Sequence, residues 1–92
     1  MYGLSNEIFE KIINIVKKYE CNFILFGSRA RGDFKYNSDI DIAIENFKKE
    51  DIYKIKNDFD LIDIPYTFDL LFIKEETNKK LLKSIRNEGV SL

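Results

Sequence analysis

The chain contains no histidine, one cysteine and one proline among its 92 residues. Without histidine, Ser-His-Asp and Cys-His catalysis are excluded, and so are nearly all zinc sites. The single cysteine, Cys21, excludes an intramolecular disulfide, and its place beside an apolar run favours a small packed side chain. Any acid–base chemistry must therefore come from Asp, Glu, Lys, Tyr or water.

Long hydrophobic runs are also missing. No apolar segment approaches the roughly 20 residues that a membrane span requires. No charged start followed by an apolar stretch and small residues marks a signal peptide. We therefore expect a soluble, cytoplasmic protein without a membrane partner, and the length of 92 residues predicts a single domain over residues 1–92.

Neither positive nor negative residues are in strong excess, because the net charge is −1. The charges are nevertheless uneven: residues 37–73 are acidic, whereas residues 29–36 and 74–92 are basic. No broad basic stripe runs along the chain, so we do not expect an extended nucleic-acid footprint. The local positive charge of residues 29–36 follows a Gly-Ser pair, at the place where a phosphate would bind.

Hydrophobic periodicity gives a coarse secondary structure. It predicts helices over residues 5–19, 48–60 and 78–88, and strands over residues 22–26, 39–45 and 67–73, with a short edge strand over residues 90–92. Ser5 or Asn6 can cap the first helix and Thr77 the last one. Because helices and strands alternate, we expect an α+β fold in which helices cover one face of a small mixed sheet.

The pair Gly27-Ser28 directly follows the first apolar strand. Glycine lets the backbone approach a ligand closely, and Ser28 adds a hydroxyl and a backbone N–H. If a helix starts there, its free N–H groups favour an anion. A Gly-Ser pair after a strand is also typical of an ordinary turn, so this motif alone does not establish a phosphate site.

Two carboxylates follow on the second strand. Asp39 and Asp41 alternate with isoleucines, so both side chains point to one face, with about 7 Å between their Cα atoms. Like charges at this spacing raise each other's pKa unless a cation intervenes, and Mg²⁺ is the natural cation for hard oxygen ligands. The same alternation also describes the solvated face of an amphipathic edge strand.

Asp69 is the third candidate, because it interrupts an otherwise apolar strand. A carboxylate in such a strand is costly to bury without a cation or hydrogen bonds. Asp60 and Asp63 compete for this role, but they fall near a helix end and in a loop, where acidic residues are common. Asp69 therefore joins Asp39 and Asp41 as a candidate metal ligand.

The run Gly-Ser-Arg-Ala-Arg-Gly, then six residues, then Asp-Ile-Asp-Ile-Ala-Ile resembles the signature of the minimal nucleotidyltransferases of the DNA polymerase beta superfamily. The resemblance is continuous from Phe26 to Ile44, and the ending Ile85–Val90 is similar to the usual end of the family. Relatives often have a proline before the Ser-Asp pair, where this chain has Lys35-Tyr36-Asn37. This departure affects the rigidity of the loop rather than the chemistry.

The resemblance implies a nucleotidyltransferase core that binds two magnesium ions and uses ATP. Asp39 and Asp41 would bind both ions, and Asp69 would bind the catalytic ion and help to activate the attacking hydroxyl. Two metal ions at such a site clamp the attacking and leaving oxygens of an in-line displacement. All three acids would therefore be both metal ligands and catalytic residues.

The resemblance also assigns the nucleotide-binding residues. Gly27 and Ser28 would hold the β and γ phosphates of the nucleotide. Arg31 would steady the loop or meet a phosphate, whereas Arg29 would face solvent.

The acceptor follows only from the resemblance, since stand-alone minimal nucleotidyltransferases commonly act as antitoxins of HEPN-type RNase toxins. The implied reaction transfers AMP from ATP to a tyrosine of the toxin. One alternative is a non-catalytic antitoxin that masks its partner by binding. Another is nucleotidyl transfer to a small molecule such as an aminoglycoside.

Overall fold

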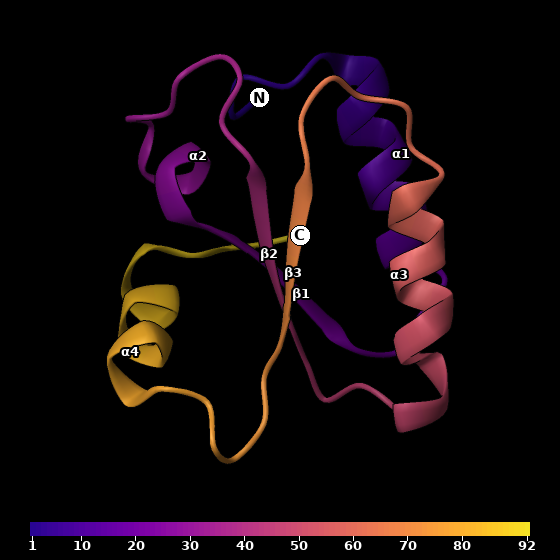
Figure 1. The fold of residues 1–92 in the computed structure, drawn as a ribbon, viewed down its shortest axis with the longest axis vertical. Helices are drawn as coiled ribbons and strands as arrows, with labels where there is room; N and C mark the ends of the chain where they lie inside the picture. The colour runs from indigo at the N-terminus through magenta and orange to yellow at the C-terminus, as the bar shows by residue number, and fades with distance from the viewer.

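The computed structural model describes residues 1–92 and shows a four-stranded mixed sheet flanked by helices (Figure 1). The elements in chain order are α1 (Asn6–Val16), β1 (Asn22–Phe26), α2 (Gly27–Arg31), β2 (Ile40–Glu45), the 3₁₀ turn η1 (Lys49–Asp51), α3 (Ile52–Asp60), β3 (Phe68–Phe72), α4 (Lys79–Glu88) and β4 (Val90–Ser91). All the predicted helices and strands are present, and their boundaries differ from the prediction by at most four residues. None of the helices is long and apolar enough to cross a membrane.

The strands are arranged in the order β3-β2-β1-β4. β1 pairs antiparallel with both β2 and β4, whereas β2 and β3 run parallel. The three isoleucines Ile40, Ile42 and Ile44 are completely buried on one face of β2, as strict alternation with polar residues predicts. The mixed sheet and the α+β class are therefore confirmed.

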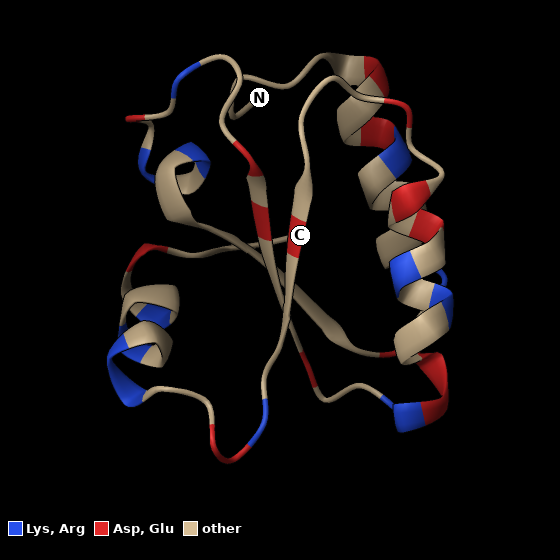
Figure 2. Cartoon of the chain, in the orientation of Figure 1, with Lys and Arg blue, Asp and Glu red and all other residues tan.

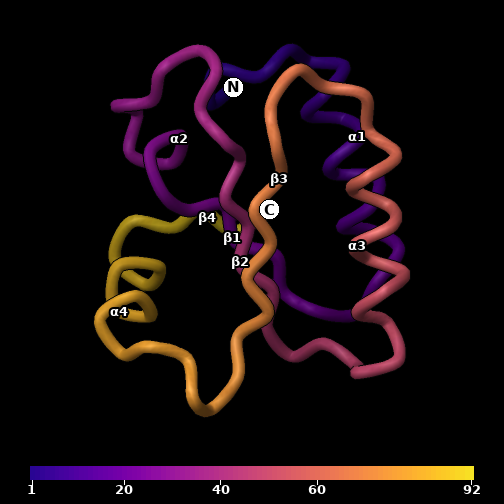
Figure 3. Tube along the Cα trace, viewed as in Figure 1, coloured from indigo at the N-terminus to yellow at the C-terminus, as the bar shows by residue number.

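The helices lie on both faces of this sheet, so the expectation that they cover one face is wrong. α1 and α3 lie on one side of the strands, and α2 and α4 lie on the other (Figures 1 and 3). The cause is β1, which is apolar on both faces: Phe23 and Leu25 point to one side, and Ile24 points to the other. Each of these faces needs its own cover of helices.

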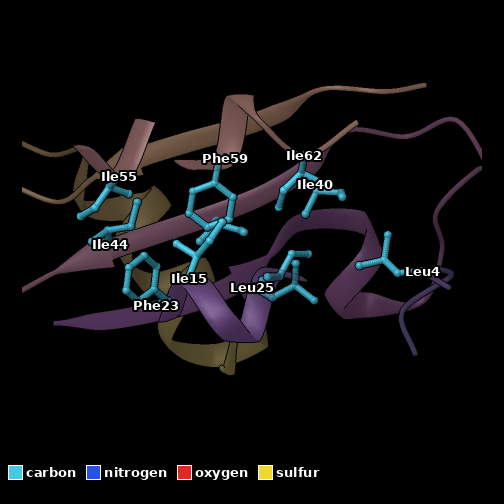
Figure 4. Packing of buried hydrophobic residues seen from close by; sticks show 11 residues of the cluster. Leu4, Ile15, Phe23, Leu25, Ile40, Ile44, Ile55, Phe59 and Ile62 are labelled. Carbon is cyan, nitrogen blue, oxygen red and sulfur yellow. The ribbon is translucent and has the colours of Figure 1, made fainter. Parts of the chain in front are cut away.

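The larger core lies between the sheet and the pair α1 and α3 (Figure 4). Its buried members are Leu4, Ile12, Ile15, Phe23, Leu25, Ile40, Ile42, Ile44, Ile55, Phe59 and Ile62. A much smaller cluster on the opposite face joins Ile24, Ala43 and Ile85, the last of these from α4. Most of the hydrophobic stabilisation therefore comes from the face that carries α1 and α3.

Side chains cap two of the helices. The Ser5 hydroxyl accepts a hydrogen bond of 3.2 Å from the Ile8 N–H and caps α1. The Asn78 side chain caps α4 by accepting from the Lys80 N–H, so the prediction of Thr77 as the cap is wrong by one residue. The Thr77 hydroxyl instead accepts from the Lys74 N–H and closes the preceding turn.

A polar contact ties the end of α1 to α3. The Tyr19 hydroxyl and the Lys18 ammonium donate to Asp58 Oδ2 at 2.5 and 2.9 Å. Burial opposes ionisation of Asp58, but the hydrogen bonds from Tyr19 and Lys18 prevail and lower its pKa. Burial and the bond to Asp58 raise the pKa of Tyr19 to about 12.

We expect Asp58→Asn to lower the free energy of unfolding by about 1 kcal/mol at pH 7. A lowered pKa in the folded state contributes stability above the unfolded pKa, and this contribution is lost as the pH falls through the folded value. The difference between variant and wild type should therefore shrink between pH 5 and pH 2 in urea unfolding experiments. Asp60→Asn, at an exposed acid, is the control; an equal loss at every pH would contradict the role of the Asp58 charge.

Candidate active site

The Gly27-Ser28 turn lies directly against Asp41. β1 ends at Phe26, whose register partner in β2 is Asp41, and α2 begins at the next residue. Gly27 has φ 75°, in the left-handed region. A Cβ atom built there would lie 3.1 Å from Asp41 Cγ and would collide with a carboxylate oxygen. Any residue with a Cβ atom at position 27 would collide with Asp41, so only glycine fits there.

The sheet register then brings Asp69 to Asp41. The two residues are direct partners in the parallel pair β2 and β3, and their segments are coloured as acidic side by side in Figure 2. Asp41 is half-buried and Asp69 is exposed. Both belong to the face opposite Ile40 and Ile42, away from the larger core.

Asp39 lies just before the first residue of β2 and is exposed. Burial raises the pKa of Asp41, and the negative charges of Asp69 and Asp39 raise it further, while Arg31 opposes them. All three acids are therefore near enough for their charges to interact. This mutual repulsion is what a bound cation would relieve.

These residues fit magnesium by their chemistry. Mg²⁺ usually takes one or two carboxylates and completes its shell with water and phosphate oxygens, and Asp41 with Asp69 offers such a pair. No group of three or more His, Cys, Asp or Glu side chains is gathered closely enough to hold a metal ion. The adjacency of Asp41 and Asp69 is thus a structural fact, and a site shared by all three acids stays a prediction.

Arg31 is exposed at the end of α2 and pairs with two carboxylates. Its Nε lies 3.3 Å from Asp33 Oδ2, and its Nη1 lies 3.2 Å from Glu88 Oε2. The first contact steadies the loop after α2, and the second joins α2 to α4. A role for Arg31 in binding phosphate stays a prediction.

Arg29 does not face solvent, and the expectation for this residue is wrong. It is 1% exposed and is the only buried charged residue of the chain. Its guanidinium donates to backbone carbonyls and stacks against aromatic rings. Sequence reasoning missed it because the acceptors are loop carbonyls, which carry no residue-specific signal.

The competing acids Asp60 and Asp63 line a surface cavity beside Phe59 and Phe68, on the side of the larger core. None of the surface cavities is lined by Asp39, Asp41 or Asp69. The acidic pair therefore lies outside these cavities, with Asp69 exposed and Asp41 half-buried.

Comparison with known families agrees with this geometry. The family described as "Polymerase beta, Nucleotidyltransferase" matches residues 10–92, which include the turn and all three acids. No curated protein matches the chain.

Proposed function

Because the chain belongs to the polymerase beta nucleotidyltransferase family, we propose that it is a magnesium-dependent enzyme that transfers AMP from ATP to a hydroxyl group. The observation that carries this proposal is the contact of the Gly27 turn with Asp41, and of Asp41 with Asp69. A close backbone turn beside paired carboxylates can hold a triphosphate and its cations at one place.

In the proposed reaction the acceptor oxygen forms a bond to the α phosphorus, and the bond to the β phosphate breaks. Pyrophosphate leaves with the bonding electron pair. Gly27 and Ser28 hold the β and γ phosphates, and bound magnesium would neutralise their charge. Asp69, the exposed member of the acidic pair, orients the acceptor hydroxyl and takes its proton. Catalysis rests mainly on positioning and on electrostatic stabilisation.

We further propose that the acceptor is a tyrosine of a HEPN-type toxin and that the chain acts as its antitoxin. This part rests on the resemblance to minimal nucleotidyltransferases. The exposure of Asp69 supports it, because a tyrosine on the surface of a partner protein can reach an exposed carboxylate.

The test uses ATP labelled at the α phosphate, Mg²⁺ and the protein encoded beside this chain. We expect label on a tyrosine of that partner and its complete loss when EDTA removes the metal. Mass spectrometry of the labelled peptide identifies the acceptor, and readdition of Mg²⁺ should restore transfer.

Two results would redirect the proposal. Protection from the toxin with no label on it would favour masking by binding. Label on an aminoglycoside, in a panel incubated with the same ATP, would favour a small-molecule acceptor.

A further inference from the structure

The buried guanidinium of Arg29 gathers three backbone carbonyls. Its Nε and Nη2 donate to the Ser38 carbonyl at 3.1 and 2.8 Å, and Nη2 also donates to the Tyr36 carbonyl at 3.2 Å. Its Nη1 donates to the Tyr2 carbonyl at 3.1 Å. Arg29 forms no salt bridge, although a buried charge normally requires close compensation. Here the three carbonyl oxygens compensate the positive charge of Arg29.

Aromatic rings complete this environment. The guanidinium carbon lies 5.2 Å from the centre of the Phe34 ring and 4.7 Å from that of the Tyr66 ring. Such contacts add cation–π attraction and exclude water from the polar cluster. The N-terminal turn also packs closely against Arg29, because a Cβ atom built on Gly3 would lie 2.9 Å from Arg29 Nη1. The guanidinium therefore has one defined position.

That position joins the two halves of the candidate active site. Arg29 directly follows Ser28 of the Gly27-Ser28 turn. The Ser38 carbonyl, which receives two of its hydrogen bonds, belongs to the peptide bond that leads into Asp39. Asp39 itself lies outside β2, which begins at Ile40, and the Ile40 N–H donates to the Thr67 carbonyl at 2.9 Å on the far side of Asp39. The Arg29 side chain thus links the Gly27-Ser28 turn to the peptide bond before Asp39, in addition to the pairing of β1 with β2.

We propose that Arg29 is a positioning residue of the active site, which fixes Asp39 relative to the Gly27-Ser28 turn through the Ser38 carbonyl. This inference rests on the proposed function for its consequence in metal and nucleotide binding. Arginine suits the task because its planar group presents five donors in a fixed fork. Lysine has three donors on a single nitrogen and cannot reproduce the spread of these bonds.

The test measures Mg²⁺-dependent binding of a non-hydrolysable ATP analogue to the wild type, Arg29→Lys and Arg29→Met. Groups that orient metal ligands typically account for about 10- to 100-fold in metal affinity. We expect Arg29→Met to raise the half-saturating Mg²⁺ concentration by about tenfold or more, and Arg29→Lys to restore only part of the loss. All measurements are made at a temperature where each variant is fully folded.

Ile55→Ala is the matched control, because it removes a buried side chain of α3 in the larger core and no contact of Arg29. We expect it to lower the melting temperature without changing the Mg²⁺ requirement. An unchanged requirement in Arg29→Met, or an equal rise in Ile55→Ala, would overturn the proposal.

A second readout needs no nucleotide. In ¹H–¹⁵N spectra, Arg29→Met should shift and broaden the amide signals of Ser38 and Asp39, while Ile55→Ala leaves them in place. Wild-type signals for these amides in Arg29→Met would overturn the positioning role. A wild-type protein that binds no ATP analogue at any Mg²⁺ concentration would instead contradict the proposed function, and the spectra would still decide the role of Arg29.

Discussion

Asp41→Asn is expected to lower the rate of nucleotidyl transfer by about 10³-fold or more, because it removes the carboxylate that lies between the Gly27-Ser28 turn and Asp69. The same substitution should not destabilise the fold at pH 7. The pKa of Asp41 is raised by burial and by its acidic neighbours, so its ionised form costs stability in the folded state. Transfer of label from ATP gives the rate, and urea unfolding gives the stability.

Asp63→Asn provides the control, since it removes an exposed acid that lies away from Asp41 and Asp69. It should transfer AMP at the wild-type rate. An Asp41→Asn variant with more than a tenth of the wild-type rate would show that the acidic pair does not carry the reaction. A variant that is inactive because it is unfolded would contradict the expected stability.

Gly27→Ala is expected to lower the free energy of unfolding by on the order of 3 kcal/mol and to abolish transfer. Two effects add: an L residue is strained at φ 75°, and its Cβ would collide with Asp41. The collision also displaces the carboxylate from the turn that it contacts. Denaturant unfolding and the transfer assay measure the two consequences separately.

Gly32→Ala separates strain from collision. Gly32 has φ 95°, but nothing lies within 4 Å of a Cβ built on it. This variant should lose only about 1 kcal/mol and should keep most of its transfer activity. Equal effects of the two substitutions would show that the contact with Asp41 is unimportant.

Local patterns were sufficient to predict the elements of the fold. Alternation of isoleucine with polar residues predicted which face of β2 is buried, and the apolar run within residues 22–26 predicted a strand, which lies inside the sheet between β2 and β4. The same alternation placed Asp41 away from the larger core. Its pairing with Asp69 depends on the parallel register of β2 and β3, which two separate strand predictions do not contain.

Features that depend on tertiary contacts were not predictable. Helices cover both faces of the sheet because Ile24 and Ala43 form a second apolar patch, which α4 buries. The burial of Arg29 depends on carbonyls from Tyr2 and Ser38, which lie far from it along the chain or in an irregular loop. In both cases the sequence shows ordinary residues, and the packing gives them their role.

The acidic pair and the larger core occupy opposite sides of a single sheet. Loss of the Asp41 carboxylate alone should therefore leave the free energy of unfolding almost unchanged. Under the proposed function, one substitution at Asp41 would separate catalysis from folding and yield an inactive but intact domain.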